Sequence, residues 1–119
     1  MKWYTYVMNE TLTTLVVDLT ASSTRLMEAK KALTIANLSL IKVERVLAEK
    51  RNMAIVEGKA SGSNESQRNA SLAMLLVEET KSVDIASDDV LMAKLTVELA
   101  SIENTTVKYC ITALTATED

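Results

Sequence analysis

Apolar residues recur along most of the chain at alternating steps of three and four, the heptad spacing of helices that pack along their length. The first series consists of Leu12, Leu15, Leu19, Ser22, Leu26, Ala29, Leu33, Ala36, Leu40, Val43 and Leu47. The second consists of Leu72, Leu76, Glu79, Val83, Ala86, Val90, Ala93, Val97, Ala100, Asn104, Val107, Ile111 and Leu114. These two series, called here the first and the second seam, predict two long α-helices.

Both glycines of the chain, Gly58 and Gly62, lie between the seams, and there is no proline. Glycine readily adopts the backbone conformations that end a helix. After the glycines, Asn64 and Gln67 have the spacing of a capping box, with Asn64 as the N-cap. We therefore expect a helical hairpin over residues 9–119, with a first helix over about 9–57, a bend over 58–63 and a second helix over about 64–116.

Residues 1–8 differ from the rest because they contain three of the four aromatic residues: Trp3, Tyr4 and Tyr6. We expect a separate N-terminal arm that ends at an N-cap on Asn9. Such an arm either packs on its own protein or docks a partner through its rings, which suit interfaces.

Further apolar residues lie beside both seams. They include Met27, Ile35, Leu38 and Ile41 in the first helix, and Leu91, Leu95, Ile102 and Tyr109 in the second. A lone hairpin buries one narrow stripe per helix, whereas helices of a larger bundle have wider stripes. We therefore predict an all-α fold of two long antiparallel helices, a coiled-coil hairpin that dimerises into a four-helix bundle.

The predicted contacts of the dimer include Leu91, Leu95, Ile102 and Tyr109. Ser22 and Asn104 interrupt the two seams at nearby levels. Because a polar residue at one seam position usually fixes register and oligomeric state, we assign that role to both.

The two halves of the chain carry opposite charge. Residues 1–62 hold nine Lys/Arg and six Asp/Glu, and residues 63–119 hold four and ten. Folding about the glycines predicts the ion pairs Arg45–Glu78, Lys42–Glu79, Lys30 and Lys31 with Asp88 and Asp89, and Arg25–Glu98. Two swapped chains would form the same pairs, so charge does not distinguish a hairpin from a swapped dimer.

The composition argues against catalysis. The chain has no histidine, the commonest general base and metal ligand. Its single cysteine, Cys110, lies beside an apolar stripe, and the glycine spacing does not match a phosphate-binding loop. We predict that the protein is not an enzyme and has no cofactor or metal site.

No apolar run approaches the length of a membrane span, and the N-terminus lacks the pattern of a signal peptide. We therefore expect a cytoplasmic protein that does not contact membranes.

Basic residues gather near the bend: Lys42, Arg45, Lys50, Arg51, Lys59 and Arg68. Such a tip could contact phosphates non-specifically, but no aromatic side chain lies among these residues to stack on bases. A nucleic-acid accessory role therefore ranks below the docking of a protein partner. The candidate contacts for that partner are Trp3, Tyr4, Tyr6, Lys50, Arg51, Lys59 and Arg68.

The segment from Gly62 to Leu72 resembles a pattern of small helical proteins of tailed bacteriophages, in which G-x-N-x-x-x-R-x-A-x-L opens the second of two long helices. The matching residues are Gly62, Asn64, Arg68, Ala70 and Leu72. Ser63 stands where the pattern often has lysine. The resemblance implies a phage or prophage origin, with the host cytoplasm as the compartment.

The same resemblance implies a non-enzymatic accessory or inhibitor protein that acts on host or phage machinery. A structural virion or spacer role stays open. From the residues themselves, we expect Arg68 to pair with Glu57 or Glu65, whereas an exposed Arg68 would make the tip a docking site.

Overall fold

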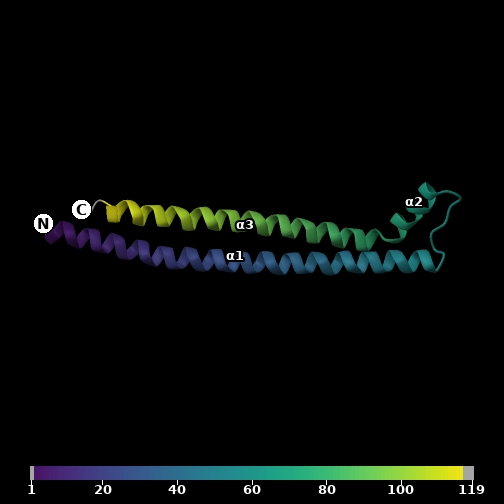
Figure 1. The fold of residues 1–119 in the computed structure, drawn as a ribbon, viewed down its shortest axis with the longest axis horizontal. Coiled ribbons are helices and arrows are strands. Elements are labelled where there is room, and N and C mark those ends of the chain that lie inside the picture. The colour runs from purple at the N-terminus through teal and green to yellow at the C-terminus, as the bar shows by residue number, and fades with distance from the viewer. Residues whose placement is uncertain (1, 117–119) are drawn as a thin grey trace. The chain divides into compact units, whose positions relative to one another are not determined.

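A computed structural model describes residues 2–116, apart from the side chains of Lys2 and Tyr4. The described chain is all-helical: α1 spans Lys2–Val56, α2 spans Glu65–Leu75 and α3 spans Val77–Ala116 (Figure 1). The predicted all-α class is confirmed, but residues 2–116 form three helices instead of two. It divides into unit 1, made of Met1–Leu33 and Ala93–Asp119, and unit 2, which is Thr34–Met92.

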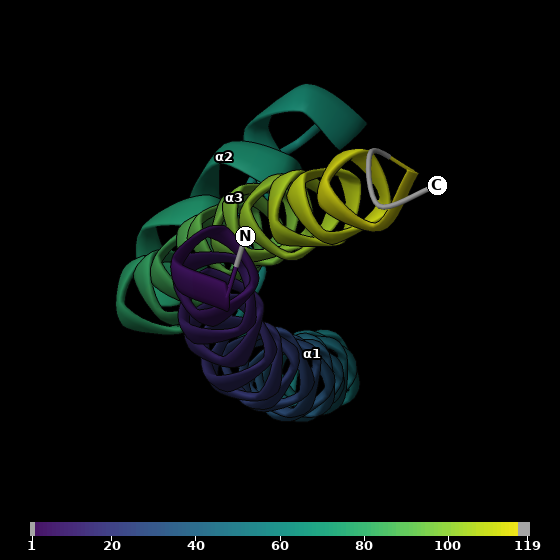
Figure 2. The same ribbon diagram turned by 90° about the vertical axis from the view of Figure 1, so that its left-hand side faces the viewer.

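In each unit a segment of α1 lies beside a segment of α3, and the two segments run in opposite directions (Figure 1, Figure 2). Every residue of the first seam, from Leu12 to Leu47, is buried or half-buried. The same holds for the second seam from Leu72 to Leu114, whereas most residues between seam positions are exposed. Burial therefore follows the heptad spacing of the sequence.

The most deeply buried apolar residues are mostly small. They include Ala29 and Ala100 in unit 1, and Ala54 and Ala86 in unit 2. Small side chains allow the backbones of packed helices to approach closely. They also bury little apolar area, so each unit has a thin core.

The first helix begins at Lys2, so the prediction of a separate arm over residues 1–8 with an N-cap at Asn9 is wrong for residues 2–8. No glycine or proline interrupts this stretch, and Met8 extends the first seam by one half-buried position before Leu12. Tyr6 Oη also donates a hydrogen bond to Glu10 Oε1, one turn along, at 3.2 Å.

The turn between α1 and α2 contains both glycines. The φ angles of Gly58 and Gly62 are 72° and 137°, in the region that favours glycine. The predicted N-cap at Asn64 is confirmed, because Asn64 Oδ1 accepts a hydrogen bond from the Gln67 N–H at 2.8 Å. The Gln67 side chain in turn accepts from the N–H of Ser63 at 2.8 Å, which fixes the entry of the chain into α2.

One residue, Leu76, separates α2 from α3, with φ −108° and ψ 22°. Its N–H donates to Leu72 O at 3.0 Å, and the Thr80 N–H donates to Leu76 O at 2.9 Å. Helical hydrogen bonding therefore continues on both sides of the break, while α2 turns away from the line of α3 (Figure 1). The expected second helix is divided here because Leu76 adopts a non-helical ψ, although no glycine or proline lies nearby.

The register of the two long helices also differs from the prediction. In unit 1, Arg25 contacts Glu103 in place of Glu98. In unit 2, Glu79 contacts Lys50 in place of Lys42, and Glu78 contacts Lys81 in place of Arg45. The prediction set the centre of the hairpin between the two glycines. Because α2 belongs to the connection, the centre lies further along the chain.

Candidate functional site

Unit 1 contains a buried polar contact across the seam. Asn104 Nδ2 donates hydrogen bonds to the hydroxyl oxygens of Ser22 and Ser23, both at 2.9 Å. The Ser22 hydroxyl donates to Leu19 O at 3.1 Å. The predicted proximity of Ser22 and Asn104 is thus confirmed, and their role in fixing the register stays a prediction.

This polar contact offers no free group to a ligand. Within residues 2–116, no buried side-chain nitrogen or oxygen lacks a hydrogen-bond partner. Beside the contact, the guanidinium of Arg25 holds the Glu103 carboxylate through two nitrogens. The arrangement joins two helices and leaves nothing unsatisfied to bind a small molecule.

Unit 2 contains a charged contact across the seam. Lys50 Nζ lies 2.7 Å from Glu79 Oε1. The hydrogen bond from Lys50 holds the pKa of the Glu79 carboxyl below its ordinary value. Lys50 stands three residues after Leu47, at the next position of the first seam. Extending the first seam by one position in the sequence would have indicated this contact. Lys50 is also one of the residues predicted to bind a partner.

The other cations of the predicted basic tip have separate environments. Lys59 Nζ lies 2.8 Å from Glu57 Oε2, so Glu57 pairs with Lys59 and not with Arg68. Arg68 is exposed and forms none of the ion pairs found in the described part of the chain. Lys50 and Lys59 of the predicted tip are therefore engaged in ion pairs, whereas Lys42, Arg45, Arg51 and Arg68 form none of those found in the described part of the chain.

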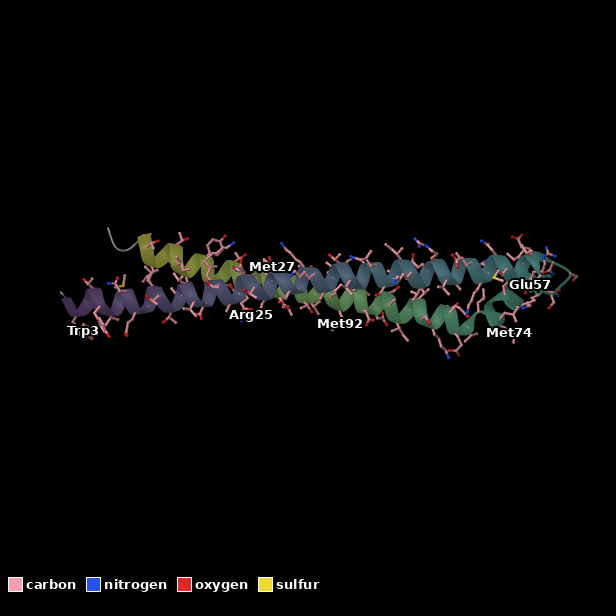
Figure 3. The ribbon with its side chains drawn as sticks, turned by 90° about the horizontal axis from the view of Figure 1, so that it is seen from below. Trp3, Arg25, Met27, Glu57, Met74 and Met92 are labelled. Atoms are coloured by element: carbon pink, nitrogen blue, oxygen red, sulfur yellow. The ribbon has the colours of Figure 1, made fainter. Side chains whose placement is uncertain are left out.

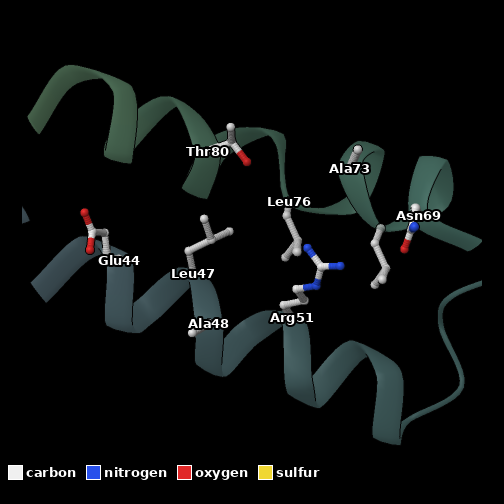
Figure 4. Close-up of a pocket in the computed structure, with 9 residues that line it drawn as sticks. Glu44, Leu47, Ala48, Arg51, Asn69, Ala73, Leu76 and Thr80 are labelled. Carbon is white, nitrogen blue, oxygen red and sulfur yellow. The ribbon is translucent and has the colours of Figure 1, made fainter. Parts of the chain in front are cut away.

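A groove of about 570 Å³ lies in unit 2 between α1 and the break at Leu76 (Figure 4). Its lining residues are Glu44, Leu47, Ala48, Arg51, Asn69, Leu72, Ala73, Leu76 and Thr80. Arg51 extends from α1 toward Leu76 across this groove (Figure 4). The lining brings together no nucleophile with a general base, and residues 2–116 contain no group of acidic or cysteine side chains that could hold a metal ion.

A large apolar face is exposed on α3 in unit 1. The exposed fractions of Leu95, Leu99, Ile102 and Tyr109 are 46%, 59%, 63% and 71%. These residues follow steps of three, four and seven on the side of α3 opposite the second seam. We call this set the α3 stripe.

The aromatic residues at the start of α1 are exposed as well. Trp3 is 78% exposed and Tyr6 is 61% exposed. The side chain of Trp3 is labelled near the start of α1 in Figure 3. The predicted contact Tyr4 has a side chain that lies outside the described part of the structure. Because the backbone is helical here, these rings project from a helix and not from an extended arm.

Apolar side chains are also exposed on the outer sides of both helices of unit 2. They include Ile35, Leu38 and Ile41 on α1, and Ile85, Leu91 and Met92 on α3. The side chain of Met92 is labelled in Figure 3. Sequence analysis selected Leu91, Leu95, Ile102 and Tyr109 but missed Leu99, Ile85 and Met92. The signal for these three is a further heptad series on α3, displaced from the second seam.

Comparison of the chain with family models, curated proteins and solved structures finds no match. Within residues 2–116, no helix has a stretch that is both long and apolar enough to cross a membrane. The geometry therefore has to define the candidate site, and the geometry singles out exposed apolar helix faces.

Proposed function

We propose that this chain is a non-enzymatic interaction protein whose helices pack against helices of another protein molecule. One observation carries the proposal: the α3 stripe is exposed although its residues have the spacing of a helix contact. Contiguous apolar surface of this kind marks an interaction site in folded proteins. A helix laid along the stripe would cover Leu95, Leu99 and Ile102 together.

The simplest partner is a second copy of the same chain. Two copies bring four long helix segments together, which is the predicted four-helix bundle in its smallest form. The thin core of each unit supports this proposal, because an apolar contact between copies adds to the small apolar area that each unit buries by itself. By its resemblance to phage proteins, the assembly would act as an accessory or inhibitor of host or phage machinery.

A nucleic-acid role has weaker support. Two of the predicted basic contacts, Lys50 and Lys59, are engaged in ion pairs with Glu79 and Glu57. Phosphate binding at these positions would have to compete with the carboxylates. Lys42, Arg45, Arg51 and Arg68 remain as candidate contacts, and no aromatic side chain lies among them to stack on bases.

The test compares the wild type with Leu95→Ser/Ile102→Ser. Light scattering should give a wild-type mass well above the 13.0 kDa of one chain, and the double variant should move to that single-chain mass. Circular dichroism should show the same helix content in both, because the stripe is exposed within one chain.

Lys94→Ser/Lys108→Ser is the matched control, since both lysines are exposed on α3 outside the stripe. It should associate like the wild type. A wild-type protein of 13.0 kDa at every concentration would overturn the proposal.

A further inference from the structure

The outer faces of the two helices in unit 2 carry opposite charge. On α1, Lys42 and Arg45 follow the exposed residues Ile35, Leu38 and Ile41. We call these five residues the basic face. Between Ala29 and Val43, α1 contains no acidic residue, and Glu44, next to Arg45, lies on the side of α1 that lines the groove with Leu47.

On α3, the exposed residues Ile85, Leu91 and Met92 lie among Asp84, Asp88 and Asp89. We call these six residues the acidic face. From Ser82 to Ala93, α3 contains no basic residue. Each face therefore combines exposed apolar side chains with charge of one sign.

Both faces point away from the contact inside the unit. Leu40, Val43 and Leu47 pack in the seam, whereas Leu38, Ile41 and Arg45 lie two residues before each of them and are exposed. Two residues correspond to about 200° of rotation in an α-helix, so the basic face lies nearly opposite the seam.

The same relation holds on α3. Val83, Ala86 and Val90 are buried or half-buried in the seam, and each acidic-face residue is exposed. The α1 and α3 segments of unit 2 pack against each other, so the two faces lie on opposite sides of the unit.

The charges of these faces are not matched within the unit. The ion pairs that unit 2 forms among its described residues are Lys50–Glu79, Lys59–Glu57 and Lys81–Glu78. None of them involves Lys42, Arg45 or the three aspartates. A partner that covers one face therefore has to supply the opposite charge together with apolar side chains.

We propose that the basic face of one copy docks on the acidic face of a second copy of this chain. The proposal rests on the proposed self-association and adds to the α3 stripe of unit 1 a second contact, between faces of unit 2. Contact between two basic faces would place Lys42 and Arg45 against like charges, and contact between two acidic faces would do the same with the aspartates. Only the mixed contact satisfies charge and apolar burial together.

The mixed contact has a consequence for assembly. It joins two different surfaces, so it is heterologous, and each pair of copies keeps one basic and one acidic face uncovered. Copies therefore add one after another until a ring closes, and the mass in solution rises beyond that of a dimer as concentration increases.

Charge exchange between the faces tests this contact. Lys42→Glu/Arg45→Glu makes both faces acidic, and Asp84→Lys/Asp88→Lys makes both basic. Each variant alone should associate at least about tenfold more weakly than the wild type, because like charges then meet. An equimolar mixture of the two variants should recover wild-type association, since each copy then meets a face of opposite charge.

The matched control is Lys94→Glu/Lys108→Glu, which reverses two exposed charges outside both faces. It should associate like the wild type in sedimentation velocity. Circular dichroism of every variant should show unchanged helix content, since all the altered side chains are exposed.

The remaining outcomes overturn the proposal in recognisable ways. Loss of association only in Asp84→Lys/Asp88→Lys would show that the basic face takes no part in the contact, and loss only in Lys42→Glu/Arg45→Glu would show that the acidic face takes no part. If the two variants do not associate when mixed, the contact between the basic and the acidic face is excluded. The proposed self-association of the wild type would still stand. A monomeric wild type would instead remove the proposed function itself.

Discussion

Two polar contacts cross the otherwise apolar seams, one in each unit. Asn104 binds Ser22 and Ser23 in unit 1, and Lys50 binds Glu79 in unit 2. Apolar seam residues tolerate sliding by one heptad, because another apolar residue then takes each place. A polar contact does not tolerate such sliding, because its partner is present at one level only. Each of the two contacts therefore favours one register of its two helix segments.

The first prediction concerns Asn104→Ala. The variant loses both hydrogen bonds to the serines, while the Ser22 hydroxyl keeps its acceptor on Leu19. We expect the free energy of unfolding to fall by about 2 kcal/mol, since a hydrogen bond contributes about 1 kcal/mol net. Urea denaturation followed by circular dichroism measures the change.

Asn37→Ala is the matched control for this prediction. Asn37 is exposed on α1 in unit 2, so its loss should change the free energy of unfolding by less than about 0.5 kcal/mol. Equal effects of the two substitutions would show that the buried hydrogen bonds add no stability.

At the scale of helices, the sections of the chain with strong periodicity were predictable. The two seams were identified at every position from Leu12 to Leu47 and from Leu72 to Leu114. The start of α1 was not predicted, because the aromatic residues before Met8 do not follow the heptad spacing that Met8 continues. The break at Leu76 was not predicted, because a leucine in the sequence does not indicate a non-helical ψ angle.

The candidate site was predictable to a similar extent. Exposure of Leu91, Leu95, Ile102 and Tyr109 agrees with their place outside the second seam. At the basic tip, Lys50 is exposed as expected, and its ammonium group also pairs with Glu79, which lies opposite it across the seam. Charge identifies a candidate contact only after the seam positions have been assigned.

The second prediction concerns the turn between α1 and α2. An added Cβ at Gly62 would lie 2.4 Å from Gln67 Cβ, inside the first turn of α2, whereas at Gly58 it would meet nothing within 4 Å. Both residues have positive φ. Gly58→Ala should therefore cost only the backbone strain, about 1–2 kcal/mol.

Gly62→Ala should lower the free energy of unfolding by more than Gly58→Ala, because the clash adds to the strain. Urea denaturation of the two variants side by side measures the difference. An equal loss would mean that α2 moves to accommodate the methyl group, and the capping contact from Asn64 to Gln67 would then not be rigid.

For the whole molecule, the uneven distribution of charge along the sequence has a structural outcome. The basic first half and the acidic second half meet within each unit, but only through Arg25–Glu103 and Lys50–Glu79 among the ion pairs found between α1 and α3 in residues 2–116. The basic and acidic faces of unit 2 keep their own charges on the outside. The surplus charge is therefore available for contacts between molecules.

The last prediction concerns how stability depends on concentration. The deeply buried apolar residues are few and mostly alanine, so a single chain gains little from burial. If copies cover one another's exposed faces, association stabilises the folded form by mass action. The midpoint of thermal unfolding should then rise steadily when protein concentration increases about a hundredfold.

Circular dichroism in cells of different path length measures this midpoint without a change of buffer. Lys42→Glu/Arg45→Glu is the comparison variant. Its midpoint of thermal unfolding should equal that of the wild type at low protein concentration and should change little when its own concentration rises. Raising the salt concentration should lower the wild-type midpoint most at high protein concentration, because salt screens the contact between charged faces. A wild-type midpoint that does not depend on concentration would mean that contacts within one chain account for all of its stability. The exposed apolar faces would then not be covered by further copies.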